Sequence, residues 1–539
     1  MNKKKIKTNK NHGITLIALI ITVIVLLILA GTAISIAVNG GDLFGRAQNA
    51  VTEYNSKVAE EEQKINDVWS ILEQASLIGK DPSGANAPVV PAATEKLEVY
   101  YLTWRQNEET GVLEEVPSET EPTTEWYNYK EGKWANIKTV NAETENEAYW
   151  VWIPRYAYKV PVRPTEETYT GNPTFEIAFL GGTGNSPVIS SELNGATIKT
   201  DTTNGVEIGD WVVHPAFNFG GTQLKGIWVA KFEASSSNTI ETGANPSSVD
   251  QNQTSLQVNV KPSSKTSPVW SWTDITVDNI FTVSQNMKNA GGALEENTSA
   301  DPHMMKNVEW GAVAYLTQSK YGQMRTGGNG QVYINNFWPD SNSSYAQPGF
   351  GGAGADTAVT TNINEVNEYN TTNGAKASTT GNVYGIYDMS GGAIEYVAAY
   401  VTTVRPEGNT IAYYADVSTV ITNLKNSSNA KYVDVYEADN TVEADSSANT
   451  AAKRVAHYAK LVNGDKILKY GDAAFETSYS GTGSTSWQKD YSYFPHSLNP
   501  VFMRGGSCSS GSDAGMFCFS SNKGSSYSFI GFRPVFVVK

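Results

Sequence analysis

Cysteine and histidine are scarce in this 539-residue chain, and their scarcity excludes several classes of site. The two cysteines, Cys508 and Cys518, are too few for a disulfide framework or for a four-cysteine zinc site. The five histidines are scattered, and no two of them have the spacing of a metal-ligand pair on a helix or a hairpin. The residue types therefore predict neither a zinc centre nor a disulfide framework.

Positive charge is also in deficit, with 40 Lys and Arg against 55 Asp and Glu and a formal net charge of −15. Such a chain repels phosphate backbones, so nucleic acid is not an expected partner. Charged residues make up only 18% of the chain, whereas hydrophobic residues reach 40% and aromatic residues 11%. This composition is typical of a globular protein built from strands and long loops.

One long apolar segment lies near the N-terminus. Residues 14–38 form a stretch of 25 residues without a charge, and about 20 apolar residues suffice to span a bilayer. A cleaved secretory signal has a much shorter apolar core, of roughly 7–15 residues. Five lysines precede the segment, which predicts a cytoplasmic N-terminus and places everything after it outside the membrane.

The junction before this segment, Asn11-His-Gly-Ile-Thr-Leu16, resembles the leader of type IV prepilins. The resemblance implies cleavage after Gly13 and methylation of the new amine on Ile14. Such pilins usually carry a glutamate at the fifth mature position, where this chain has Ala18. The resemblance therefore implies processing at residues 13–14 and leaves assembly into a filament open.

The helix is expected to continue beyond the membrane as a stalk to residue 77. Apolar residues recur there at a period of 3.5, which fits either a coiled-coil seam or a pilin stalk packed on its own head. The proline- and glycine-rich run 78–96 then predicts a linker. We divide the chain into a leader (1–13), a transmembrane and stalk helix (14–77), this linker, a small β-rich pilin-like segment (97–145) and a domain over 146–539.

From residue 97 onward, short apolar-aromatic runs alternate with turn residues, and we interpret these runs as strands. The clearest are 99–104, 149–153, 211–213, 227–232 and 269–272. One helix is expected to start at Asp301-Pro302, an N-cap followed by proline, and to run to Ser319.

A second resemblance rests on motifs that occur in the same order as in the formylglycine-generating-enzyme, or sulfatase-modifying-factor, family. The motifs are 147–154 (EAYWVWIP), 227–233 (IWVAKFE), 308–315 (VEWGAVAY), 385–397 (GIYDMSGGAIEYV), 504–507 (RGGS) and 530–533 (IGFR). The resemblance implies an α+β, loop-rich domain of the C-type-lectin-like fold.

The chemistry of that family is not expected here. Its enzymes hold copper with two cysteines separated by four residues, whereas nine residues separate Cys508 from Cys518. The family also has a calcium loop, onto which Gly391, Ala393 and Glu395 fall, although Gly392 and Ile394 replace its asparagine and tryptophan. Oxygen ligands suit calcium. The alternative is that Glu395 binds nearby backbone or an arginine.

The stretch 508–529, within a variable region 504–533, is drawn mainly from Ser, Cys, Tyr, Phe, Asn and Asp, with glycines at turns. These residues share codons ending in C, a pattern that resembles the target proteins of diversity-generating retroelements, in which mutated adenines turn asparagine codons into this set. Tyrosine and serine also suit adaptable binding surfaces. The predicted ligand-binding residues are Cys508, Ser509, Ser510, Ser512, Asp513, Cys518, Ser520, Ser521, Asn522, Ser525, Ser526, Tyr527, Ser528 and Phe529.

Together these features predict a non-enzymatic protein of the bacterial cell surface, anchored by one N-terminal helix and binding a protein or glycan on another cell, host or phage. Other pilins are further expected partners, and calcium is the one cofactor considered. A divergent oxidase of the same family and a structural minor pilin are the alternatives.

Overall fold

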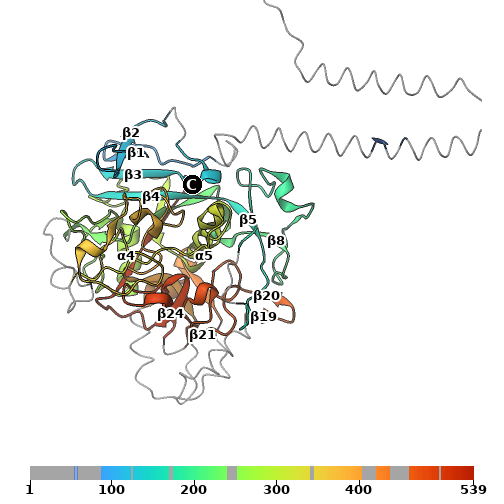
Figure 1. The fold of residues 1–539 in the computed structure, drawn as a ribbon. Helices are drawn as coiled ribbons and strands as arrows, with labels where there is room; N and C mark the ends of the chain where they lie inside the picture. Colours follow the sequence, from blue (N-terminus) through green and yellow to red (C-terminus); the bar gives the residue numbers. More distant parts are fainter. Residues whose placement is uncertain are drawn as a thin grey trace, which may run out of the picture. The chain divides into compact units, whose positions relative to one another are not determined.

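The computed structural model describes residues 87–122, 126–168, 174–238, 252–339, 345–402, 421–437, 461–496 and 499–539, together with Tyr54, Lys57 and Val58 (Figure 1). Contacts divide the chain into two units, Met1–Leu72 and Glu73–Lys539, and the eight ranges all belong to the second unit. The predicted leader, membrane span and stalk, including Gly13, Ile14 and Ala18, lie outside the described residues. Within the described part of the chain, none of the helices is both long and apolar enough to cross a bilayer.

The first large sheet contains seven strands in the order β14-β26-β11-β4-β3-β1-β2, and every neighbouring pair is antiparallel. The strands are β1 (Leu97–Gln106), β2 (Leu113–Ser118), β3 (Asn136–Asn141), β4 (Glu147–Pro154), β11 (Gly226–Ala230), β14 (Ala300–Met304) and β26 (Pro534–Val538). The segment 97–145 thus supplies three strands of the same sheet as β4, and the predicted boundary at residue 145 falls between two paired strands.

The second large sheet carries the C-terminal stretch. Its order is β18-β17-β23-β24-β22-β21, and β25 pairs in parallel with β17. The strands are β17 (Ile394–Val401), β18 (Asp434–Tyr436), β21 (Thr482–Gly483), β22 (Ser492–Tyr493), β23 (Val501–Gly505), β24 (Gly515–Asn522) and β25 (Ile530–Phe532). A smaller four-stranded sheet has the order β6-β5-β8-β7, with β5 (Tyr156–Lys159), β6 (Ile177–Phe179), β7 (Ile198–Lys199) and β8 (Trp211–Val213).

Three described helices pack against these sheets, α4 (Val277–Asn286), α5 (Asn307–Thr317) and the one-turn α7 (Thr422–Lys425). Helix α4 contacts both β14 and β17, which places it against both large sheets. Every residue of α5 except Val308 is buried. The architecture is therefore mixed α+β, mostly strands with few short helices.

The predicted helix start at Asp301-Pro302 is wrong. Both residues lie in β14, where Pro302 pairs with Phe536, and the helix begins only at Asn307. Because β14 is an edge strand with a single partner, its proline costs the sheet little. The helix start is instead stabilised by carboxylates, since Glu309 accepts from the Lys306 amide at 2.8 Å and Asp434 from the Val308 amide at 2.8 Å.

Four of the five predicted strands are confirmed in β1, β4, β8 and β11, and residues 269–272 are the exception. Residues 269–272 are buried or half-buried, but they pair with no other strand. The Ser271 amide donates to Ala346 and the Trp272 amide to Ala234. Apolar character alone predicted burial there, and it did not predict pairing.

Candidate ligand-binding surface

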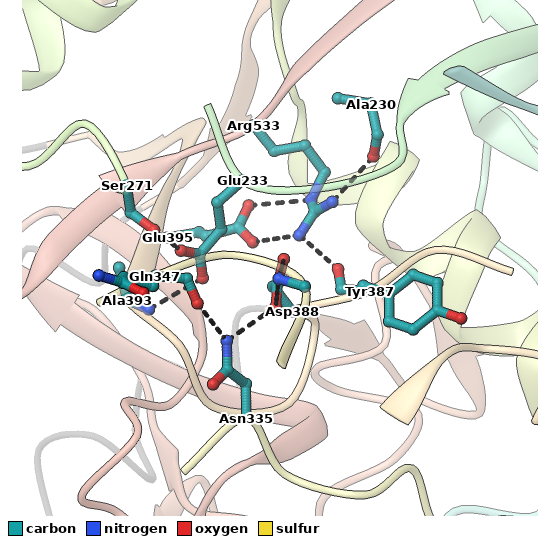
Figure 2. Close-up of polar contacts among 11 residues, drawn as sticks. Ala230, Glu233, Ser271, Asn335, Gln347, Tyr387, Asp388, Ala393, Glu395 and Arg533 are labelled. Carbon is teal, nitrogen blue, oxygen red and sulfur yellow. Dashed lines mark hydrogen bonds and ion pairs between the residues drawn. The ribbon is translucent and has the colours of Figure 1, made fainter. Parts of the chain in front are cut away.

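The chain crosses from the second sheet to the first at Arg533, between β25 and β26. This guanidinium is fully buried and holds the two sheets together (Figure 2). It binds the Glu395 carboxylate of β17 through two bonds, of 2.7 and 3.2 Å, and donates to the carbonyl oxygens of Ala230 and Tyr387, each at 2.8 Å. The terminal IGFR motif therefore forms a cross-link inside the scaffold.

Two further carboxylates lie in the same buried cluster, Glu233 and Asp388. Glu233 accepts from the Ala393 amide at 2.8 Å and from the Ser271 hydroxyl, and Asp388 accepts from the Gly349 amide and the Asn335 side chain. Burial raises the pKa of Asp388 to about 6 and raises the pKa of Glu233 well above its usual range. Three buried carboxylates thus surround one arginine.

Glu395, which the sequence offered as a calcium ligand, instead belongs to this buried cluster. Both of its carboxylate oxygens bind Arg533, which is the arginine alternative raised from the sequence. Among the described residues, no group of three or more His, Cys, Asp or Glu side chains is arranged to hold a metal ion. The backbone beside it also serves the cluster, because Gly392 has a φ of +73° and a Cβ there would lie 2.3 Å from a Glu233 oxygen.

The segment 392–394 contacts this cluster through the Ala393 amide, and it also binds both ends of the predicted ligand-binding stretch. The Cys508 amide donates to the Gly392 carbonyl at 2.8 Å, and the Ile394 amide donates to the Phe529 carbonyl at 3.0 Å. Residues 508 and 529 therefore contact backbone positions only two residues apart.

Most of the predicted ligand-binding side chains reach solvent. Ser509, Ser512, Tyr527 and Phe529 are exposed, and a second group is half-buried, consisting of Ser510, Asp513, Ser520, Asn522, Ser525, Ser526 and Ser528. The Tyr527 and Phe529 rings lie 5.4 Å apart, centroid to centroid, with 37% and 38% of their surfaces exposed. We call these eleven residues the C-terminal surface.

Cys508, Cys518 and Ser521 are corrections to the predicted set, because all three are buried. Ser521 shares a face of β24 with Phe517 and Phe519, since side chains alternate along a strand. Cys518 points to the other face of β24 and is buried there too, within electrostatic reach of Asp490 and Arg504. Cys508 turns inward to within electrostatic reach of Glu233.

Burial also decides the reactivity of the two thiols. It raises the pKa of Cys508 to about 12 and raises the pKa of Cys518 well above its usual range. Only the thiolate acts as a nucleophile or a strong metal ligand, and both groups are thiols at neutral pH. Because both side chains are buried, replacing either cysteine with serine is expected to cost about 1–3 kcal/mol, the penalty for a buried hydroxyl without a partner.

Several residues that contact the C-terminal surface were not predicted from the sequence. The Asp274 amide donates to the Tyr527 carbonyl at 2.9 Å, and the Ser484 hydroxyl binds the Asp513 carboxylate at 2.6 Å. Tyr491 and Tyr493 stack with their ring centroids 6.0 Å apart beside β24. The alternation of aromatic and polar residues at 491–494 was the one pattern that could have indicated a strand here.

No family model matches this sequence, and no curated protein matches it either. Among solved structures, the chain is similar to Treponema denticola variable protein 1, at 12% sequence identity over 62% of this chain and 89% of that chain. The TM-score of this comparison is 0.24, which does not establish a common fold.

Proposed function

We propose that this chain is a ligand-binding protein whose binding site is the C-terminal surface, and that the site tolerates extensive changes of side chain. The observation that carries the proposal is the way in which the scaffold holds the stretch. It does so mainly through the main chain of that stretch, so that most of the side chains there remain available.

The loop 523–529 illustrates this. The amides of Val277, Asp274 and Ile394 donate to the carbonyl oxygens of Gly524, Tyr527 and Phe529, and the Tyr396 hydroxyl donates to the Ser525 carbonyl at 2.8 Å. On the other side, the Tyr491 amide donates to the Asp513 carbonyl at 3.0 Å. Any residue type offers these carbonyl acceptors, so substitution of the side chains leaves the anchoring bonds in place.

The finer parts of the proposal join this arrangement to the sequence motifs. The domain is a C-type-lectin-like scaffold, and its C-terminal surface is the target of a diversity-generating retroelement. The ligand is a protein or glycan of another cell, a host or a phage. The codon-restricted composition of 508–529 supports a retroelement target. The expected genomic signature is an adenine-rich near-copy of this gene segment beside a reverse-transcriptase gene. An oxidase is disfavoured by the buried thiols.

A pair of libraries displayed on cells as the full chain tests the proposed site. One library randomises Ser509, Ser512, Ser526, Tyr527 and Phe529, and a matched library randomises five buried positions (Phe517, Cys518, Phe519, Ile530 and Phe532). We expect most members of the first library to resist protease like the parent and most members of the second to be degraded, because surface changes usually cost within about 0.5 kcal/mol.

Selection of the first library on biotinylated lysozyme then tests binding. Enrichment of clones whose affinity disappears when Tyr527 or Phe529 reverts supports the proposal, since aromatic residues dominate binding hot spots. Equal protease sensitivity in the two libraries, or no enrichment from the first, contradicts it.

The proposal includes display at the cell surface through the N-terminal segment, with other pilins as further partners. We predict that protein extracted from membranes begins at Ile14, because Gly13 ends a basic leader and precedes 25 uncharged residues. Edman sequencing of the extracted chain is the measurement. A chain that starts at Met1, or beyond Ala30, contradicts cleavage at this junction.

A further inference from the structure

A groove away from the C-terminal surface collects positive charge on this acidic chain. It consists of two adjoining hollows, of about 640 and 380 Å³, which share Pro215, Asn218 and Tyr470 as lining residues. No residue of 508–529 lines either hollow. We call the two hollows together the lysine groove.

The charges that line the lysine groove reverse the balance of the whole chain. Arg155 and Lys199 line the larger hollow and Lys306, Lys431 and Lys469 the smaller, whereas Asp434 is the one carboxylate in either lining. The chain as a whole carries 40 Lys and Arg against 55 Asp and Glu. Burial lowers the pKa of His214, which also lines the larger hollow, to about 3, so this imidazole is neutral and the positive charge comes from the lysines and the arginine.

The carboxylates near these cations leave the interior of the groove positive. Lys199 pairs with Asp210 at 2.8 Å, Lys431 with Asp301 at 2.8 Å and Lys306 with Glu309 at 3.8 Å, and none of these three carboxylates lines a hollow. Asp434, which lines the smaller hollow, accepts from the Val308 amide and lies within electrostatic reach of Lys306 and Lys469. The Lys469 ammonium lies 5.2 Å from the centroid of the Tyr436 ring and forms no ion pair with a residue that the structure describes.

Arg155 contributes a charge that is held firmly in place. The side chain is almost fully buried, and its bonds include those to the carbonyl oxygens of Gly184 and Phe217 and to the Asn185 side chain, which position the guanidinium. Burial lowers the pKa of Arg155 only to about 10, so the group is cationic at neutral pH. The hydroxyls and amides of Thr200, Thr202 and Gln223 add neutral hydrogen-bonding groups to the same hollow.

We propose that the lysine groove is a second binding site, and that it takes an elongated ligand carrying phosphate groups in both hollows. Four of the five cations are lysines, compact point charges of the kind that bind phosphate, and a phosphate group offers three strong acceptor oxygens where a carboxylate offers two. Each hollow is lined by its own cations, and the two hollows meet at Tyr470. A chain of phosphates can place an anionic group in both hollows, whereas a single ion can occupy only one. The site is independent of the function proposed for the C-terminal surface.

Calorimetric titration of the full chain in detergent with tripolyphosphate tests this site. We expect saturable binding that weakens as salt is added, and a loss of roughly tenfold in affinity for Lys199→Gln combined with Lys469→Gln, or about 1.4 kcal/mol. The matched control is Lys265→Gln, which removes the same charge from an exposed position outside the groove and is expected to leave the affinity within about twofold.

Three outcomes would overturn the proposal: no saturable binding, an equal loss in the Lys265→Gln control, or equally tight binding of polyglutamate, which would indicate non-specific attraction of polyanions. Lys469→Gln alone guards against misfolding, because Lys469 is half-buried and has no ion pair to break among the described residues. An unchanged melting temperature together with weakened binding in this single variant supports the site.

Discussion

Replacing Arg533 with methionine is expected to lower the free energy of unfolding by about 3–5 kcal/mol, the usual cost of removing one partner from a buried ion pair. The change leaves Glu395 buried without its two charge-assisted bonds, and it also removes donors to Ala230 and Tyr387. Because these groups belong to different sheets, both sheets should be affected. Chemical denaturation of the full chain followed by tryptophan fluorescence is the measurement.

The dependence of this loss on pH is a second test of the same variant. Burial already raises the pKa of Asp388 to about 6 with the arginine present, and without it the buried carboxylates bind protons more readily in the folded state. A carboxyl group whose folded-state pKa is raised stabilises the fold at low pH and loses that stabilisation as the pH rises through the raised value. The variant should therefore be closer to the parent at pH 5 than at pH 8.

The control is the double variant Arg533→Met with Glu395→Leu, which removes both charges. It should recover part of the loss, because a buried pair replaced by apolar residues costs far less than one orphaned charge. A single variant as stable as the parent at pH 8, or a double variant less stable than the single, would show that the cluster does not join the sheets.

Short-range features of the fold were predictable from the sequence. Runs such as 149–153 and 211–213 are apolar and bounded by turn residues, and local alternation of this kind predicts a strand whatever its partner. Helix α4 could also have been predicted, since the Thr276 hydroxyl caps the Asn279 amide and Ile280, Phe281 and Ser284 form a buried face.

Long-range pairing was not predictable. The strand at Asp301-Pro302 forms because β26, more than 230 residues later, pairs with it, and local cap signals carry no information on that partner. The same holds for Ser521, which is polar but buried because it shares a face of β24 with Phe517 and Phe519. The restricted set of residue types in 508–529 marked this stretch as a candidate binding surface. The main-chain bonds that hold the stretch join residues far apart in the sequence, so the sequence did not predict them.

The division between framework and C-terminal surface gives the last prediction. Phe532→Ala is expected to lower the free energy of unfolding by about 3–5 kcal/mol, the usual cost of truncating a buried phenylalanine. Its ring is fully buried, with its centroid 5.8 Å from that of Trp272, and its backbone pairs with Tyr396 of β17 while its carbonyl accepts from the Ala234 amide. The alanine variant keeps the backbone bonds and loses only the packing.

Tyr527→Ala is the matched variant, an aromatic truncation five residues earlier on the same stretch. Its ring is 37% exposed, and the two main-chain bonds that its carbonyl accepts, from the Asp274 and Ile530 amides, survive the change, so the loss should stay below about 1 kcal/mol. Thermal unfolding of the two variants side by side separates framework from surface, because both lose an aromatic ring and only one ring is buried. Equal losses in the two variants would mean that Tyr527 belongs to the folded core, and the C-terminal surface could then not vary without unfolding the domain that carries it.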